Sequence, residues 1–160
     1  MDTSLVQVEG MFKTNTDLVK KATEGIPEEH WFRQPGDASN HLMWVAGHLV
    51  VGRGSVLRLL GSEWAVPWDS IFTRGAKLAA RDQYPGVGEI RKAWDNASEQ
   101  LLKSLADPPV DVLTKPAPEG KPSFDGKVSG LIAFLAFHET YHVGQVSYLR
   151  KWLGYGQTVG

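Results

Sequence analysis

The sequence predicts an all-α protein built as a four-helix bundle with at least one crossover connection. Four long stretches carry apolar residues at three- and four-residue steps, the spacing of one helix face. The alternation of apolar and polar residues that is typical of strands is nearly absent. Two connecting segments, residues 62–85 and 107–126, are longer than the loops of an up-down-up-down bundle. At 160 residues the chain has the size of one ordinary domain, so we expect a single domain over residues 1–160.

The first and third helices are bounded by glycine and proline. An apolar stripe predicts the first helix over residues 4–24, and the Gly-Ile-Pro sequence at 25–27 ends it. The third helix is expected to begin after the turn sequence at 85–88 and to end at Ala106, because two prolines follow closely. Residues 110–113 are the one short candidate for a strand, although prolines crowd them.

The second and fourth helices carry the residues of greatest interest. The second is expected to have Ser39 or Asn40 as its N-cap and to stop at Gly61. The fourth is expected over residues 125–154, and a short helix is expected around 69–77. The inward half of the fourth helix should comprise Leu131, Phe134, Leu135, His138, Tyr141, His142, Gln145, Tyr148, Leu149 and Trp152.

The composition excludes several classes of partner and site. The formal net charge is −1, so nothing favours nucleic acid or an anionic membrane as partner. There is no cysteine, which excludes disulfides, a thiolate nucleophile and a Cys-ligated zinc. Residues 1–10 do not resemble a signal peptide, and no apolar run approaches the roughly 18–20 residues of a membrane span. We therefore expect a soluble cytoplasmic protein whose partner is a small molecule.

The most informative motif is His138-Glu139-Thr140-Tyr141-His142 in the fourth helix. Histidines at positions i and i+4 lie on one helix face, one turn apart, so both imidazoles can meet a single metal ion. The same residues match HExxH, the zinc-protease signature, in which Glu139 would be the general base. In a bundle, Glu139 could instead reach a neighbouring helix or a subunit interface.

A third ligand is needed, because zinc centres usually take three protein ligands and a water. The residues after the motif include no His, Asp or Glu, so this ligand must lie upstream. His48 lies in an apolar run, where an ionisable group needs a partner, and Gly47 and Gly52 would let a neighbouring helix approach. His41 is expected in the first helical turn near solvent, and His30 at the surface. We therefore predict a site formed by His48 and the two histidines of the motif.

Such a site would carry a net charge of +2 and leave one face open. Zinc fits three imidazole nitrogens with a vacant position, and nickel also suits imidazole. The metal could activate water, polarise a carbonyl or hold a thiolate. Two further residues are weak candidates for roles in catalysis. Gln145 could contact a metal ligand or the substrate, or only pack between helices, and Tyr141 could donate a hydrogen bond or belong to the core.

Three segments resemble the DinB-like superfamily of metal-dependent proteins. They are Pro-Gly-Asp-Ala-Ser-Asn at 35–40, Trp-Val-Ala-Gly-His-Leu at 44–49 and His-Glu-Thr-Tyr-His-Val-Gly-Gln at 138–145. The resemblance spans essentially the whole chain and implies a four-helix bundle of up-down-down-up order, commonly a homodimer. It also implies a divalent metal, often zinc or nickel, on three histidines, which correspond to His48, His138 and His142.

The resemblance implies less about the reaction. Some relatives look like thiol S-transferases that use bacillithiol or mycothiol, including maleylpyruvate isomerases, and their metal activates the thiolate of the cofactor. We therefore expect a metal-dependent enzyme, either a thiol S-transferase or a small-molecule hydrolase. The alternatives are a metal-binding stress-response protein without catalysis and an HExxH peptidase. A stripe of aromatic residues on the fourth helix is expected to belong to the core or to a dimer interface; it comprises Phe134, Phe137, Tyr148 and Trp152.

Overall fold

The computed structural model describes residues 5–159 and is entirely helical over that range apart from its connections. The long helices are α1 (Val6–Thr23), α2 (Leu42–Leu59), α3 (Val87–Ala106) and α5 (Val128–Trp152). Short helical turns occupy the connections: η2 (Glu28–Phe32), η3 (Asp69–Phe72), η4 (Arg81–Gln83) and α4 (Val110–Leu113). Within residues 5–159, no helix has the length and hydropathy needed to cross a membrane.

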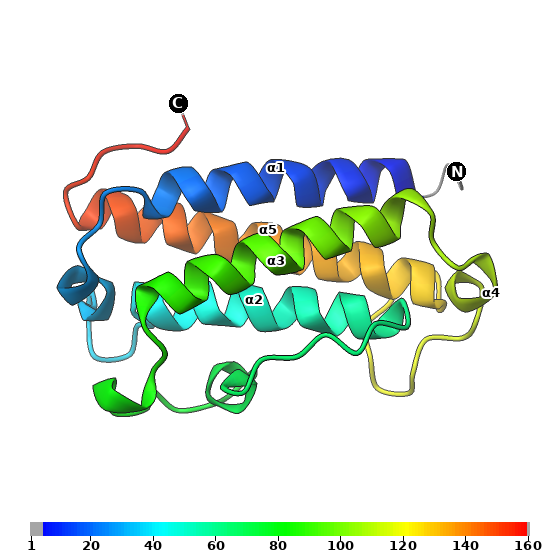
Figure 1. The fold of residues 1–160 in the computed structure, drawn as a ribbon, viewed down its shortest axis with the longest axis horizontal. Helices are drawn as coiled ribbons and strands as arrows, with labels where there is room; N and C mark the ends of the chain where they lie inside the picture. The colour runs from blue at the N-terminus through cyan, green and yellow to red at the C-terminus, as the bar shows by residue number, and fades with distance from the viewer. Residues whose placement is uncertain (1–4, 160) are drawn as a thin grey trace.

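The four long helices form the predicted bundle. Figure 1 shows α1 and α5 running in one direction along the long axis and α2 and α3 running in the other, which is an up-down-down-up order. The main helix contacts join α1 to α5 and α3, and α2 to α3 and α5, so α1 and α2 lie diagonally opposite. Because α2 and α3 are parallel, the chain must return along the bundle between them, and this explains the long connection.

A buried polar layer divides the core of the bundle. Two apolar clusters fill its two halves, one around Trp31, Met43 and Phe72 and the other around Phe12, Leu57 and Leu101. Between them lies a group of buried polar residues that draws on all four long helices: Thr16 from α1, Arg53 from α2, Ser98 from α3 and Glu139 from α5. This polar layer was not predicted from the sequence.

Three expectations about local structure differ from what the structure shows. The candidate strand at 110–113 is the helical turn α4, because the carbonyl of Pro109 accepts from the amides of Val112 and Leu113. The N-cap of α2 is neither Ser39 nor Asn40 but His41, whose Nδ1 accepts from the amide of Trp44 at 3.1 Å. The short helix expected at 69–77 is only the turn η3.

Helix α5 differs from expectation in its start and in its inward face. It begins three residues later than predicted because Asp125 caps the preceding loop, its Oδ1 accepting from the amides of Lys127 and Gly130. Three aromatic residues assigned to the inward half are exposed: Tyr141 by 62%, Tyr148 by 61% and Trp152 by 42%. Helix α5 itself carries apolar residues on all of its faces, so periodicity alone could not identify the face that packs inward.

Candidate metal centre

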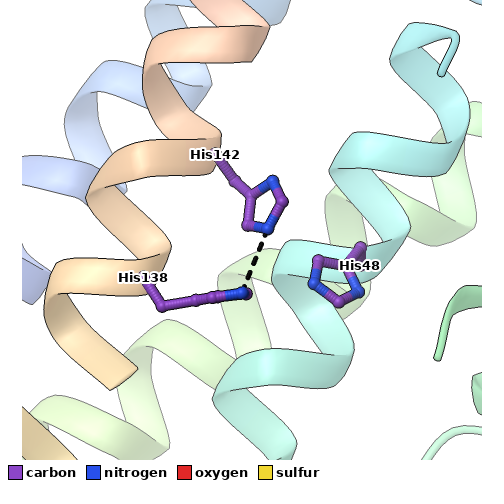
Figure 2. Close-up of side chains that lie close together, drawn as sticks. All are labelled: His48, His138 and His142. Carbon is purple, nitrogen blue, oxygen red and sulfur yellow. Dashed lines mark hydrogen bonds between the residues drawn. The ribbon is translucent and has the colours of Figure 1, made fainter. Parts of the chain in front are cut away.

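Three histidines from two helices converge beside the polar layer. His138 and His142 lie one turn apart on α5, and His48 faces them from α2 (Figure 2). Each residue offers a nitrogen such that all three atoms lie within 4.8 Å of one another. Among the residues that the structure describes, this is the one group of three or more His, Cys, Asp or Glu side chains with such spacing.

The spacing fits a single divalent cation. Two imidazole nitrogens at 2.0–2.1 Å from a tetrahedral zinc lie roughly 3.3 Å apart. The Nε2 atoms of His138 and His142 are 3.2 Å apart, joined by the dashed line in Figure 2. All three rings are half-buried, so one side of the group stays accessible to a further ligand.

The backbone of η3 orients the ring of His48. Its Nδ1 donates to the carbonyl oxygen of Phe72 at 2.7 Å, since a carbonyl can only accept. The lone pair is therefore on Nε2, the nitrogen available to a metal. The indole of Trp44 stacks on the same ring with centroids 4.8 Å apart and planes 10° apart. Together these contacts hold His48 in one orientation and one tautomer.

Gln145 does the same for His142. Its Oε1 lies 2.7 Å from Nδ1 of His142, and an amide oxygen accepts the N–H of that nitrogen. Nε2 of His142 is left as the ligand atom that faces His138. Hydrogen bonds of this type fix the tautomer of metal-binding histidines. Of the roles left open for Gln145, the structure therefore favours contact with a ligand histidine.

Burial keeps these imidazoles neutral near pH 7. It lowers the pKa of His142 to about 4, with further lowering by the charges of His48 and His138, although the bond to Gln145 opposes the shift. Burial also lowers the pKa values of His48 and His138, and the positive charge of Arg74 contributes at His138. Neutral imidazole is the form that binds a metal, so these shifts favour ligation.

Glu139, the base of the peptidase alternative, is bound to Arg53. Its Oε1 and Oε2 accept from Nη2 and Nε of Arg53 at 2.8 Å and 2.9 Å, and both side chains are buried. Both oxygens of the carboxylate are therefore held by Arg53 in the core, and the geometry does not present Glu139 as a base beside the histidines. The contact joins α5 to α2. Glu139 therefore reaches a neighbouring helix, which is one of the two alternatives to the base role that the sequence had left open.

The remaining candidates lie apart from the three histidines or point outward. Tyr141 is exposed and packs its ring edge-on against His142, with centroids 5.3 Å apart. His41 was expected near solvent but is buried, and its ring lies among those of Phe32 and Tyr84. Burial lowers the pKa of His41. His30 bonds through Nδ1 to the hydroxyl of Tyr155 at 2.6 Å.

Arg53 and Phe72 are the residues at this centre that the sequence analysis missed. Arg53 lies in the same apolar helix as His48, so the argument that an ionisable group there needs a partner applies equally to it. That signal would have found Arg53 and suggested a carboxylate opposite. Phe72 acts through its backbone carbonyl, for which no sequence signal exists.

Gly47 allows Phe72 to reach this position. A Cβ at Gly47 would overlap the ring of the fully buried Phe72, whereas no atom lies within 4 Å of a Cβ at Gly52. The sequence had suggested that these glycines let a neighbouring helix approach, but neither has that role. Gly47 accommodates one side chain of η3, and Gly52 lies in open space.

We expect Gly47→Ala to destabilise the protein by about 1–3 kcal/mol through overpacking. The matched control Gly52→Ala should instead stabilise it by about 0.5–1 kcal/mol, because alanine is favoured over glycine inside a helix. Urea unfolding of both variants checks the prediction. Equal changes of the same sign would show that Phe72 does not depend on the space at Gly47.

The buried His41 should make stability depend on pH. Because its pKa is lowered in the folded state, the unfolded chain takes up the proton first, near the ordinary value of about 6.5. The free energy of unfolding should therefore fall as the pH decreases from 7 to 5. His41→Asn keeps a side-chain acceptor for the N-cap but removes the titration, so the fall should be smaller. Urea unfolding at several pH values in chelator measures both slopes, and identical slopes would contradict the prediction.

A large cleft adjoins the three histidines. Its volume is about 1060 Å³, and α2, α5 and the segments at 73–74 and 118–122 line it. Ligand pockets typically span roughly 300–1,000 Å³, so the cleft has room for an organic molecule beside the histidines. The walls are mostly apolar, and among the described residues Glu139 is the one carboxylate in the lining.

Comparison with known proteins identifies a family. A family model described as the DinB superfamily matches residues 11–146, which include all four long helices in whole or in part and the three histidines. No curated protein sequence matches the chain.

Proposed function

The chain belongs to the DinB superfamily, and we propose that it is a divalent-metal-dependent enzyme acting on a small molecule in the cleft beside His48, His138 and His142. One observation carries the proposal. Three neutral imidazoles from two helices have ligand atoms within 4.8 Å of one another at the wall of a cleft large enough for a substrate.

The residues around the histidines support a preformed site. Phe72 and Gln145 each accept the Nδ1 proton of one histidine, which directs Nε2 of His48 and of His142 toward the shared position. Zinc and nickel both suit such ligands. When bound, the ion would supply Lewis-acid character and open positions for a thiolate or a carbonyl oxygen. The apolar walls would exclude water from the reacting groups.

Within this class we favour thiol transfer over hydrolysis. The one carboxylate that lines the described part of the cleft, Glu139, is held by Arg53. No other acidic side chain among the described lining residues could serve as a general base, so hydrolysis would depend on the metal alone to activate water. A low-molecular-weight thiol brings its own nucleophile, so S-transfer does not require such a base. For the same reason the peptidase alternative receives no support from the geometry.

The experiment combines metal content with activity. Protein purified without a nickel column should contain about one divalent ion per chain, the number that three histidines hold as a single centre. Transfer of a thiol such as bacillithiol or mycothiol to small electrophiles should then require this ion and stop in chelator. Bound metal without transfer would favour a non-catalytic metal-binding protein. Casein cleavage by the wild-type protein that stops in chelator would revive the peptidase.

We also propose that the chain forms a homodimer through the exposed face of α5. This face carries Phe137, Tyr141, Tyr148 and Trp152 and has Gly144 at its centre, where no atom lies within 4 Å of a Cβ. Clustered exposed aromatic residues with few charges are typical of protein interfaces. Phe137 and Tyr141 also line the cleft, so a partner on this face would border the site.

Tyr148→Glu should convert the dimer to a monomer, because it introduces an unpaired charge into the apolar interface. Light scattering at several concentrations measures the mass. The control Val110→Glu alters an exposed apolar residue of α4, which lies at the end of the bundle where α5 begins (Figure 1), and should leave the mass unchanged. A wild-type chain that stays monomeric would refute the proposed interface.

A further inference from the structure

The cleft has a charge pattern that the metal-site proposal does not use. Three cationic side chains line it: Arg58 from α2, Arg74 after η3 and Lys121 from the loop before α5. Ion pairs among the described residues join Lys20 to Asp95, Arg53 to Glu139 and Lys115 to Asp111. None of these pairs involves a cation of the cleft, and Glu139, the one carboxylate among the described lining residues, is already paired with Arg53.

Arg74 is the cation of the cleft that follows η3. It lies two residues after Phe72, whose carbonyl orients His48, and its neighbour Thr73 also lines the cleft. Arg74 and His138 line the same cleft. Arg58, by contrast, donates to the carbonyl of Trp64 and to the hydroxyl of Ser55 and lies further along α2.

The rest of the cleft is apolar and extends away from the histidines. Leu131, Phe134 and Leu135 line it on α5, and Val56 and Leu59 line it on α2. From His138 to Leu131 the helix rises roughly 10 Å, at 1.5 Å per residue. A carbon skeleton of several atoms can therefore lie along this wall while one end remains beside the histidines.

We propose that the cleft binds an organic anion, with its charged group at Arg74 and its carbon skeleton along the apolar wall of α5. The inference rests on the proposed function, because it names the substrate class of the same site. Arginine suits this role, since its planar guanidinium presents paired donors to a carboxylate or phosphate. A bound divalent ion would strengthen the positive potential and favour the same class of ligand.

The test compares an acid with its neutral amide. Calorimetry of the zinc-loaded protein with 4-phenylbutyrate and 4-phenylbutanamide should show the acid binding at least about tenfold more tightly, as expected for a charge-assisted hydrogen bond. Arg74→Gln should weaken binding of the acid by about tenfold and leave the amide unchanged. Arg33→Gln removes an exposed arginine outside the cleft and should change neither affinity.

Failure of the inference is distinct from failure of the metal proposal. Zinc content is measured before each titration, and the titrations are repeated on metal-free protein. If no zinc is taken up, the metal proposal fails, while a preference for the acid that depends on Arg74 would still support the anion site. Equal binding of acid and amide, or equal binding of the acid to wild type and Arg74→Gln, would overturn the inference. The second outcome would assign acid binding to the metal or to another cation of the cleft.

Discussion

Replacing Glu139 with glutamine is expected to lower the free energy of unfolding by about 3–5 kcal/mol, because it leaves the buried charge of Arg53 uncompensated. Arg53 is 0% exposed and uses all of its donors. Two bond to Glu139, and the others bond to the carbonyl of Phe12 and to the hydroxyls of Thr16 and Ser98. A loss of this size is a large part of the roughly 5–15 kcal/mol that stabilises an ordinary domain.

A double variant separates the ion pair from its packing. Arg53→Met with Glu139→Leu should recover most of the lost stability, since apolar residues of similar volume often replace a buried ion pair without loss. Thr16 and Ser98 keep partners in that variant because their hydroxyls also donate to the carbonyls of Phe12 and Trp94. Asp95→Asn breaks an exposed pair with Lys20 and should have a far smaller effect. A single Glu139→Gln change as mild as this control would contradict the prediction.

Removal of one histidine is expected to abolish metal binding at ordinary concentrations. Loss of an outer-shell partner alone weakens metal binding roughly 10- to 100-fold, so loss of a ligand should exceed that. His48→Ala and His142→Ala should therefore both reduce affinity by more than about a hundredfold. Competition with a chromophoric chelator measures the affinities, and metal analysis measures the stoichiometry.

The same variants should lose stabilisation by metal. Free zinc at 1,000 times its dissociation constant stabilises a folded protein by about 4.1 kcal/mol. Wild type should show such an increase on adding zinc, and His48→Ala and His142→Ala should not. His30→Ala is the control, because His30 bonds to Tyr155 and not to the three histidines. If His48→Ala bound as much zinc per chain as wild type and with the same affinity, His48 would not be a ligand.

The fold could be anticipated largely because helical periodicity is local. The bounds of α1 and α3 agree with expectation to within two residues, since glycine and proline end helices through their own backbone geometry. At Gly61, the expected end of α2, the backbone has φ of 91°, a conformation that favours glycine. The candidate strand failed because a short segment of three apolar residues and one aspartate between prolines fits a helical turn equally well.

The candidate site could be anticipated in part. The spacing of His138 and His142 requires only that the segment be helical, so the sequence alone determined that they share a face. His48 followed from the cost of burying an ionisable group without a partner. The pairing of Arg53 with Glu139 could not be derived in this way, because it depends on which helices are neighbours and on their rotation.

The sequence by itself therefore determined an all-helical chain, the positions of its long helices and a pair of histidines suited to one metal ion. Only the tertiary structure decided which face of the apolar helix α5 packs inward, that Glu139 bonds to Arg53, and that the carbonyl of Phe72 orients His48. The physical reason is the range of the interactions. Helical periodicity and capping act between residues a few positions apart, whereas these contacts join residues 24 or more positions apart.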